Sequence, residues 1–218
     1  MGRTLKYDFA GSDFRVAAED LTGAGLVKAF APDLAPPLRL TVDLGFGRGE
    51  LLVELAKDEP GAALLGVEYS FKRVLKLARR LARSELRNVR LVCDTAEAIV
   101  GDRLTDASVH AFWINFPDPW PKKRHHRRRL IQPAFVRLLA GRLAPGGLLH
   151  AATDHEAYSE VIAEVLAGEP RLENLHAPAG FRLEPPPRAA TAYELEWRAQ
   201  GRECRYFAYR RRREAGVA

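Results

Sequence analysis

Short apolar runs alternate with amphipathic stretches along most of this chain, and this alternation predicts the fold. The apolar runs have the length of buried strands, and they are 40–44, 63–67, 89–93, 109–114 and 147–151. Between them apolar side chains recur at helical spacing, most clearly in 70–83, 133–143 and 154–167. Strand–helix alternation of this kind predicts a doubly wound α/β domain, with a mostly parallel sheet that carries helices on both faces.

Both ends of the chain depart from this pattern. Glycines and prolines break any periodicity in residues 1–37, so we expect an irregular amino-terminal arm there and a single domain over 38–218. Two further strands, at 181–183 and 204–209, are predicted around the Pro185 to Pro187 run, joined by a long loop. By composition, the segment around Thr191 to Glu194 belongs to that loop.

Composition excludes several classes of protein. A hydrophobic fraction of 47% is too high for intrinsic disorder, and no apolar run is long enough to span a membrane. The first residues carry no secretory signal. Cys93 and Cys204 lie far apart and have no neighbours at ligand spacing, which argues against a disulfide scaffold or a metal site. We therefore expect a cytoplasmic protein without a metal. The sequence leaves the choice between a monomer and a homodimer open.

The positive charge of the chain is concentrated in one segment. The formal net charge is +6, and residues 122–129 alone hold six basic side chains and no acidic one. Without them the remaining 28 basic and 28 acidic residues balance. A cationic run of this kind suits nucleic-acid phosphates, and Lys123, Arg124, Arg127 and Arg128 are its candidate RNA-backbone contacts. The alternative is a turn with a solvated charge run.

A glycine-rich loop follows the first apolar run. Gly45, Gly47 and Gly49 let the backbone turn sharply and approach a ligand, just ahead of a helix. The next strand ends at Glu68, where a carboxylate can accept hydrogen bonds from both ribose hydroxyls. Asp43 favours a ligand with a cationic amino-acid end, namely S-adenosylmethionine. A dinucleotide and a ligand-free strand–helix turn remain alternatives, although the dinucleotide fingerprint would need glycine at Glu50.

A proline-rich loop follows the fourth apolar run and leads directly into the basic segment. Asp118 stands between Pro117 and Pro119, whose rings fix the backbone, and Trp120 adds a flat apolar face. A rigid carboxylate beside an aromatic ring is suited to holding a flat base against a methyl donor.

These segments together resemble the bacterial tRNA (guanine-N7)-methyltransferases. The resemblance covers residues 40 to 210 and is carried by the glycine loop 43–50, by the block 115–125 with its Asp-Pro-Trp-Pro-Lys-Lys-Arg-His sequence, and by 152–154 and 191–194. It implies a Rossmann-like class I methyltransferase domain that transfers a methyl group from S-adenosylmethionine to N7 of a guanosine, position 46, in the variable loop of tRNA.

The resemblance also implies roles for individual residues. Asp118 would be the catalytic residue and would also lie at the cofactor. The implied cofactor contacts are Asp43, Gly45, Gly47, Glu68 and Asp94, and the implied substrate contacts are Lys122, Asp154, Thr191, Ala192, Tyr193 and Glu194. Asp43 stands where the family often has Glu, which shortens its reach and keeps its charge.

Several of these residues have plainer interpretations. Asp94 can serve as a helix N-cap, and Asp154 can do so with Thr153 and Glu156 spaced as a capping box. His125 and His126 are expected to face solvent or phosphate. The cluster 210–213 suits either RNA contact or a frayed tail.

Two other functions remain open. One is S-adenosylmethionine-dependent methylation of an exocyclic amino group of another RNA or DNA, because residues 115–120 are loosely similar to the loop of those enzymes. The other is a non-catalytic RNA-binding protein.

Overall fold

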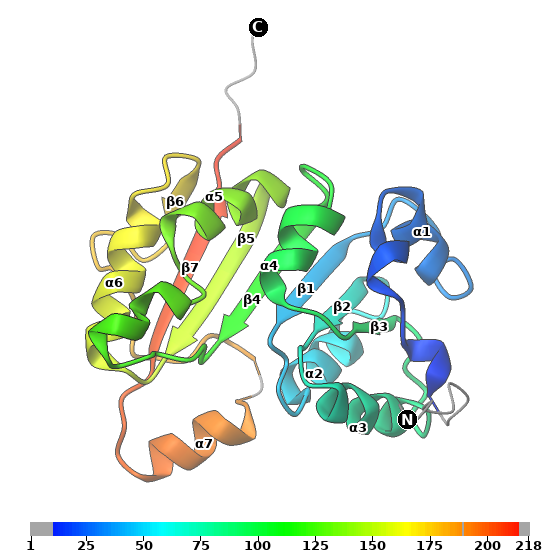
Figure 1. The fold of residues 1–218 in the computed structure, drawn as a ribbon, viewed down its shortest axis with the longest axis horizontal. Coiled ribbons are helices and arrows are strands. Elements are labelled where there is room, and N and C mark those ends of the chain that lie inside the picture. The colour runs from blue at the N-terminus through cyan, green and yellow to red at the C-terminus, as the bar shows by residue number, and fades with distance from the viewer. Residues whose placement is uncertain (1–10, 189, 214–218) are drawn as a thin grey trace, which may run out of the picture.

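The computed structural model describes residues 11–188 and 190–213, and the strands in these ranges form one seven-stranded sheet (Figure 1). Strands β1 to β5 are parallel, while β7 runs antiparallel to both β5 and β6. The order β3-β2-β1-β4-β5-β7-β6 confirms the predicted α/β class. The bounds are Leu40–Leu44 (β1), Ala63–Val67 (β2), Val89–Val92 (β3), Val109–Asn115 (β4), Leu143–Thr153 (β5), Leu172–Asn174 (β6) and Arg205–Arg211 (β7).

Helices connect the strands. The α-helices are Ala24–Phe30 (α1), Glu50–Asp58 (α2), Phe71–Leu81 (α3), Ala96–Ala98 (α4), Pro133–Arg142 (α5), Glu156–Ala167 (α6) and Ala192–Ala199 (α7). Three 3-10 segments lie at Ser12–Phe14, Ala18–Leu21 and Lys123–Arg128, and a π-helical turn at Ile99–Arg103.

The sheet separates two hydrophobic cores. Successive side chains of a strand point to opposite faces, so Leu64 and Leu65 of β2 belong to different cores. Leu65 lies in the larger core, to which α5 contributes Phe135. Leu64 lies in the smaller core with Leu52 of α2 and Val74 of α3. Helices therefore cover both faces, as the alternating pattern predicts.

The strand order fixes where a ligand can bind. β1 lies between β2 and β4, so the connections that leave β1 and β4 diverge to opposite faces of the sheet. Open sheets of this type bind ligands beyond the carboxyl ends of their strands at such a switch point. Figure 1 shows α7 beyond the carboxyl ends of β4 and β5, on this edge of the molecule.

The expected irregular arm is partly helical in the range that the structure describes. Residues 11–37 contain α1 and two 3-10 segments, and the Phe30 side chain is fully buried in the larger core. The guanidinium of Arg90 on β3 pairs with Asp33 at 2.6 Å. Glycine and proline shorten the helices here, but apolar burial still orders the segment. The first ten residues of the predicted arm lie outside the described residues.

The predicted carboxyl-terminal strands are partly wrong. The second is present as β7, whereas residues 181–183 form only a single bridge, between Arg182 and Tyr206. The neighbour of β7 on its outer side is β6. The predicted long loop contains α7. Local composition missed this helix, which packs through tertiary contacts described below.

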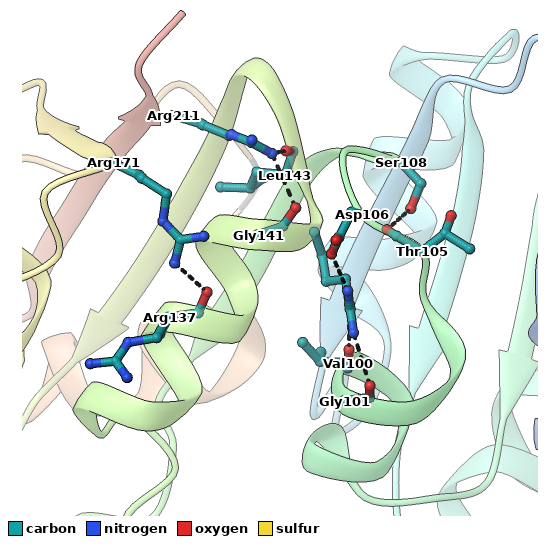
Figure 2. A network of polar contacts seen from close by, with 11 residues as sticks. Val100, Gly101, Thr105, Asp106, Ser108, Arg137, Gly141, Leu143, Arg171 and Arg211 are labelled. Atoms are coloured by element: carbon teal, nitrogen blue, oxygen red, sulfur yellow. Dashed lines mark hydrogen bonds and ion pairs between the residues drawn. The ribbon is translucent and has the colours of Figure 1, made fainter. Parts of the chain in front are cut away.

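Arginine side chains bind carbonyl groups near the end of α5, at the edge of the sheet opposite the switch point (Figure 2). Arg211 donates to the carbonyl oxygen of Gly141 at 3.0 Å, and Arg171 donates to that of Arg137 at 2.7 Å. The Gly141 carbonyl is one of the last four of α5 and has no intrahelical partner, and a cation suits this end of the helix dipole. Arg211 of the cluster 210–213 is therefore tied to the domain, which a frayed tail would not be.

Candidate active site

The glycine loop after β1 has left-handed backbone torsions at three positions. The φ angles of Gly45, Gly47 and Gly49 are 79°, 58° and 75°, values that other residues adopt only with strain. A Cβ on Gly45 would meet no atom within 4 Å, whereas one on Gly49 would lie 2.5 Å from Leu77. The Gly45 N–H donates to the Val67 carbonyl at 2.8 Å, which fixes the loop against the end of β2.

Glu68, which follows β2, is held in a fixed orientation beside the glycine loop. Only 2% of the residue is exposed. Its carboxylate accepts hydrogen bonds from the backbone N–H groups of Gly47 at 3.1 Å and Ser70 at 2.9 Å. Arg73 lies 3.4 Å away. The backbone of the glycine loop thus positions the acid that the sequence singles out.

A pocket of about 500 Å³ opens at the carboxyl ends of β1, β2 and β4. Gly45, Glu68, Asp94 and Asp118, four of the residues expected at a cofactor, line it. The remaining lining residues are Leu44, Val67, Tyr69, Arg73, Thr95, Ala96, Glu97, Asn115, Phe116, Pro117, Trp120, Arg128 and Leu130. The structure therefore brings together residues that are up to 73 positions apart, from Gly45 to Asp118.

Asp43 lies behind this pocket, inside β1, and is only 2% exposed. Burial raises the pKa of its carboxyl group to about 7; the nearby positive charge of Arg188 opposes this rise, and the negative charge of Glu68 adds to it. A carboxylate with this pKa is only partly ionised at neutral pH. A cationic group placed beside it would favour the charged form.

The loop after β4 is strained at both ends of its proline-rich core. Phe116 and Trp120 have φ angles of 51° and 41°, which are uncommon for bulky residues. The Phe116 N–H donates to the carbonyl oxygen of Ala152 on β5 at 2.8 Å. Asp118, exposed between two prolines, lines the pocket. The loop therefore presents this carboxylate from a stiff backbone.

The basic segment that follows presents its charges on the surface. Lys122, Lys123, Arg124, Arg127 and Arg128 are all exposed, and residues from Lys123 onward form a 3-10 turn. Arg128 also lines the pocket, with its guanidinium carbon 5.1 Å from the centre of the Trp120 ring. The charges of this segment are therefore mostly exposed, and one of them reaches the pocket itself.

Arg129 and the two histidines depart from the picture of a solvated run. Arg129 is buried: it donates to the carbonyl oxygen of Pro119 at 2.8 Å and lies over the ring of Tyr158. The His126 ring lies 3.1 Å from the guanidinium of Arg129, and the His125 ring meets that of Trp120 edge-on. Both histidines are half-buried and pack around the loop, so they are less exposed than expected.

The segment that composition marks as an ordinary loop begins α7. Thr191 and Glu194 form a capping box, in which the Glu194 N–H donates to the Thr191 hydroxyl at 3.2 Å. Tyr193 is exposed and packs against Phe116, with 5.0 Å between ring centres. Glu194 is fully buried, so the implied direct contact of its side chain with substrate does not fit this position.

Neither aspartate considered as an N-cap serves as one. His155 caps α6 with its ring nitrogen, which accepts from the Tyr158 N–H, while Asp154 pairs with Arg202 at 2.9 Å. Thr95 caps α4 with its hydroxyl. Both aspartates lie near the carboxyl edge of the sheet. Asp94 lines the pocket, whereas the Asp154 side chain is only 9% exposed and is held by Arg202.

Sequence reasoning missed a buried cluster under the site, centred on Arg188. Its guanidinium reaches Asn115 at the end of β4 and lies over the ring of Trp113, which is buried. The His150 ring stacks on Trp113 with centres 4.0 Å apart. Burial, and secondarily Arg188, lowers the pKa of His150 to about 4, so this ring is neutral at pH 7. An arginine in a proline-rich stretch gives no sequence signal of such a position.

Neither a metal site nor a membrane span is found in the part of the chain that the structure describes. No group of three or more His, Cys, Asp or Glu side chains there could hold a metal ion, and no helix there is long and apolar enough to cross a membrane.

The strand order and the pocket at the switch point define a Rossmann-like class I methyltransferase fold. The solved structure of the 16S rRNA methyltransferase KamB superposes on this chain with a TM-score of 0.57, at 15% identity, over 88% of this chain and 94% of that one.

The chain belongs to a methyltransferase family whose model, described as "Putative methyltransferase", matches residues 38–206. A relative named tRNA (guanine-N(7)-)-methyltransferase from Halorhodospira halophila is 43% identical over 78% of this chain and 74% of its own length. One of the same name from Bordetella pertussis is 46% identical over 70% of this chain, a match that spans 59% of the relative's length.

Proposed function

We propose that this protein transfers the methyl group of S-adenosylmethionine to N7 of a guanosine in tRNA, in the variable loop, and does so in the cytoplasm as a monomer or homodimer. One observation carries the proposal: Asp118 lines the same pocket as Glu68, and its loop runs directly into the exposed cations from Lys122 onward. The names of the curated relatives support the same reaction and substrate class.

The pocket fits the proposed methyl donor. Glu68 is already oriented by two backbone N–H groups, and its carboxylate would accept hydrogen bonds from ribose hydroxyls. Asp94, at the same pocket, would accept from an adenine amino group. Gly45 and Gly47 would let the backbone approach the ligand, and Asp43 would attract its ammonium group through the pocket wall. When bound, S-adenosylmethionine supplies an electrophilic methyl group carried on a sulfonium.

The acceptor side requires orientation more than proton transfer. Guanine N7 has an in-plane lone pair, so no base must deprotonate it before it forms its bond to the methyl carbon. Methylation leaves a positive charge on the guanine ring. A carboxylate held by a stiff loop, as Asp118 is, would stabilise this charge or accept hydrogen bonds from the guanine N1 and N2 edge.

The surface around the pocket would seat the tRNA. Lys122, Lys123, Arg124 and Arg127 are exposed cations for the phosphate backbone. Arg128 would contact RNA closer to the target base, because it lines the pocket. From the other side, Asp154 and the first turn of α7 (Thr191, Ala192 and the exposed Tyr193) would contact the substrate, while buried Glu194 would act through that turn.

Incubation of the protein with unmethylated tRNA and labelled donor tests this function. Borohydride–aniline treatment cleaves RNA at N7-methylguanosine, and we expect a single cut in the variable loop. Label on an exocyclic amino group would instead support the alternative methyltransferase activity. Titration with S-adenosylhomocysteine adds a second readout, because a non-catalytic RNA-binding protein would not bind it.

A further inference from the structure

Arg188 forms a buried connection between α7 and β4, the strand that leads into the Asp118 loop. Its side chain is 4% exposed, and it pairs with the fully buried Glu194 of α7 at 2.8 Å. The same guanidinium lies 3.4 Å from the side-chain oxygen of Asn115, the last residue of β4. The second oxygen of Glu194 accepts the Tyr206 hydroxyl of β7 at 2.5 Å. Three elements of the fold thus meet at one ion pair.

Both ends of this connection lie within a few residues of the site. Asn115 is three positions before Asp118, at the start of the strained loop. Glu194 follows Tyr193 in the first turn of α7, and Tyr193 itself packs on Phe116 of that loop. A displacement of α7 would therefore change the position of the loop that presents Asp118, and the reverse is also true.

The chemistry of the contact requires arginine. A guanidinium presents several donors in one plane, so it can bond Glu194 and Asn115 together, while a lysine ammonium on a longer, flexible stem is a point charge. Burying an ion pair costs desolvation and often adds little net stability, whereas removing one partner leaves a buried charge unpaired and is strongly destabilising.

We propose that Arg188 is a positioning residue for methyl transfer, because its guanidinium holds the substrate-facing turn of α7 against the end of β4 and so aligns the Asp118 loop. The resemblance to known proteins assigned no role to Arg188, and the catalytic part of the proposal rests on the proposed function.

The matched test compares Arg188→Lys with Arg198→Lys, an exposed arginine of α7. Lysine at 188 keeps a positive charge beside Glu194 but cannot bond Glu194 and Asn115 together. We expect kcat for tRNA to fall between about 10- and 100-fold, as small misplacements of reacting groups do. The Kd for S-adenosylhomocysteine and the Tm should stay near wild type, and Arg198→Lys should match wild type throughout. Added methylguanidine should restore part of the activity of Arg188→Ala.

Hydrogen exchange gives a readout that does not depend on the acceptor. Arg188→Lys should raise the exchange of amides in α7 and in the loop after β4, with α3 unchanged. Unchanged exchange in both segments, or wild-type kcat, would overturn the proposal. So would a fall in Tm and in S-adenosylhomocysteine affinity that accounts for the lost activity, which would mean a merely structural role. If wild-type protein does not methylate tRNA, the proposed function fails, and the exchange comparison still decides the role of Arg188.

Discussion

The buried guanidinium of Arg129 donates a hydrogen bond to the carbonyl oxygen of Pro119, 2.8 Å away, and so ties the end of the basic segment to the loop that carries Asp118. The 3-10 turn Lys123–Arg128 lies between these two anchor points. The cationic surface and the candidate catalytic carboxylate therefore belong to one closed loop.

Replacing Arg129 should affect the stability of this loop more than the affinity of the protein for RNA. We expect Arg129→Gln to lower the free energy of unfolding by about 1–3 kcal/mol, because a buried charge-assisted hydrogen bond is lost. Denaturant unfolding measures this change, with Arg127→Gln, at an exposed position, as the control that should leave stability unchanged. Equal stability of the two variants would contradict the anchoring role.

Asp118→Ala should leave tRNA affinity largely intact and lower kcat by about 100-fold, as the loss of one electrostatic stabiliser does. Single-turnover methylation and filter binding separate the two effects. Asp58→Ala, an exposed position at the end of α2, serves as the matched control and should behave as wild type. Unchanged turnover in Asp118→Ala would exclude a catalytic role for this carboxylate.

Lys122→Ala and Arg124→Ala should weaken tRNA binding and flatten its salt dependence. Each lost phosphate contact lowers the slope of log K against log salt by about one. Binding titrations across a range of salt concentrations give this slope, and Arg83→Ala, exposed at the end of α3, controls for a general loss of positive charge. If affinity at low salt is the same in all three variants, RNA binds elsewhere.

Asp43→Asn should stabilise the ligand-free protein more as the pH rises. Folding raises the pKa of this carboxyl group from 3.8 to about 7, so between these values the folded state binds more protons than the unfolded state. Stability then falls with rising pH, by up to about 1.4 kcal/mol per pH unit. Asp43→Asn has no carboxyl group at this position, so it does not lose stability in this way. The difference in Tm between the variant and wild type should therefore grow from pH 5 to pH 8.

The same substitution should weaken ligand binding. Since an ammonium group favours the ionised form of Asp43, wild-type affinity for S-adenosylhomocysteine should rise as the pH increases from 5.5 to 7, and Asp43→Asn should lose that dependence. Calorimetry in buffers of different ionisation enthalpy would detect the released proton. A pH-independent affinity in wild type would mean that Asp43 does not interact with the ammonium group of the ligand.

The local pattern was sufficient to find the sheet. The apolar runs 40–44 and 63–67 are the strands β1 and β2 without change, because a buried parallel strand needs a short, continuous apolar run. The position of Glu68 and Asp118 directly after apolar runs also predicted that they lie near each other, since residues that follow parallel strands meet at one edge of the sheet.

Tertiary structure decided which charged side chains are buried and which of the shorter segments are helical. The sequence shows eight residues of one basic run, and only the fold separates exposed Lys122 from buried Arg129. It likewise buries Arg188 and Glu194 together and turns a loop-like composition into α7. These outcomes depend on partners such as Asn115, 73 positions from Arg188. Non-local packing brings such residues together, and no periodicity along the chain records it.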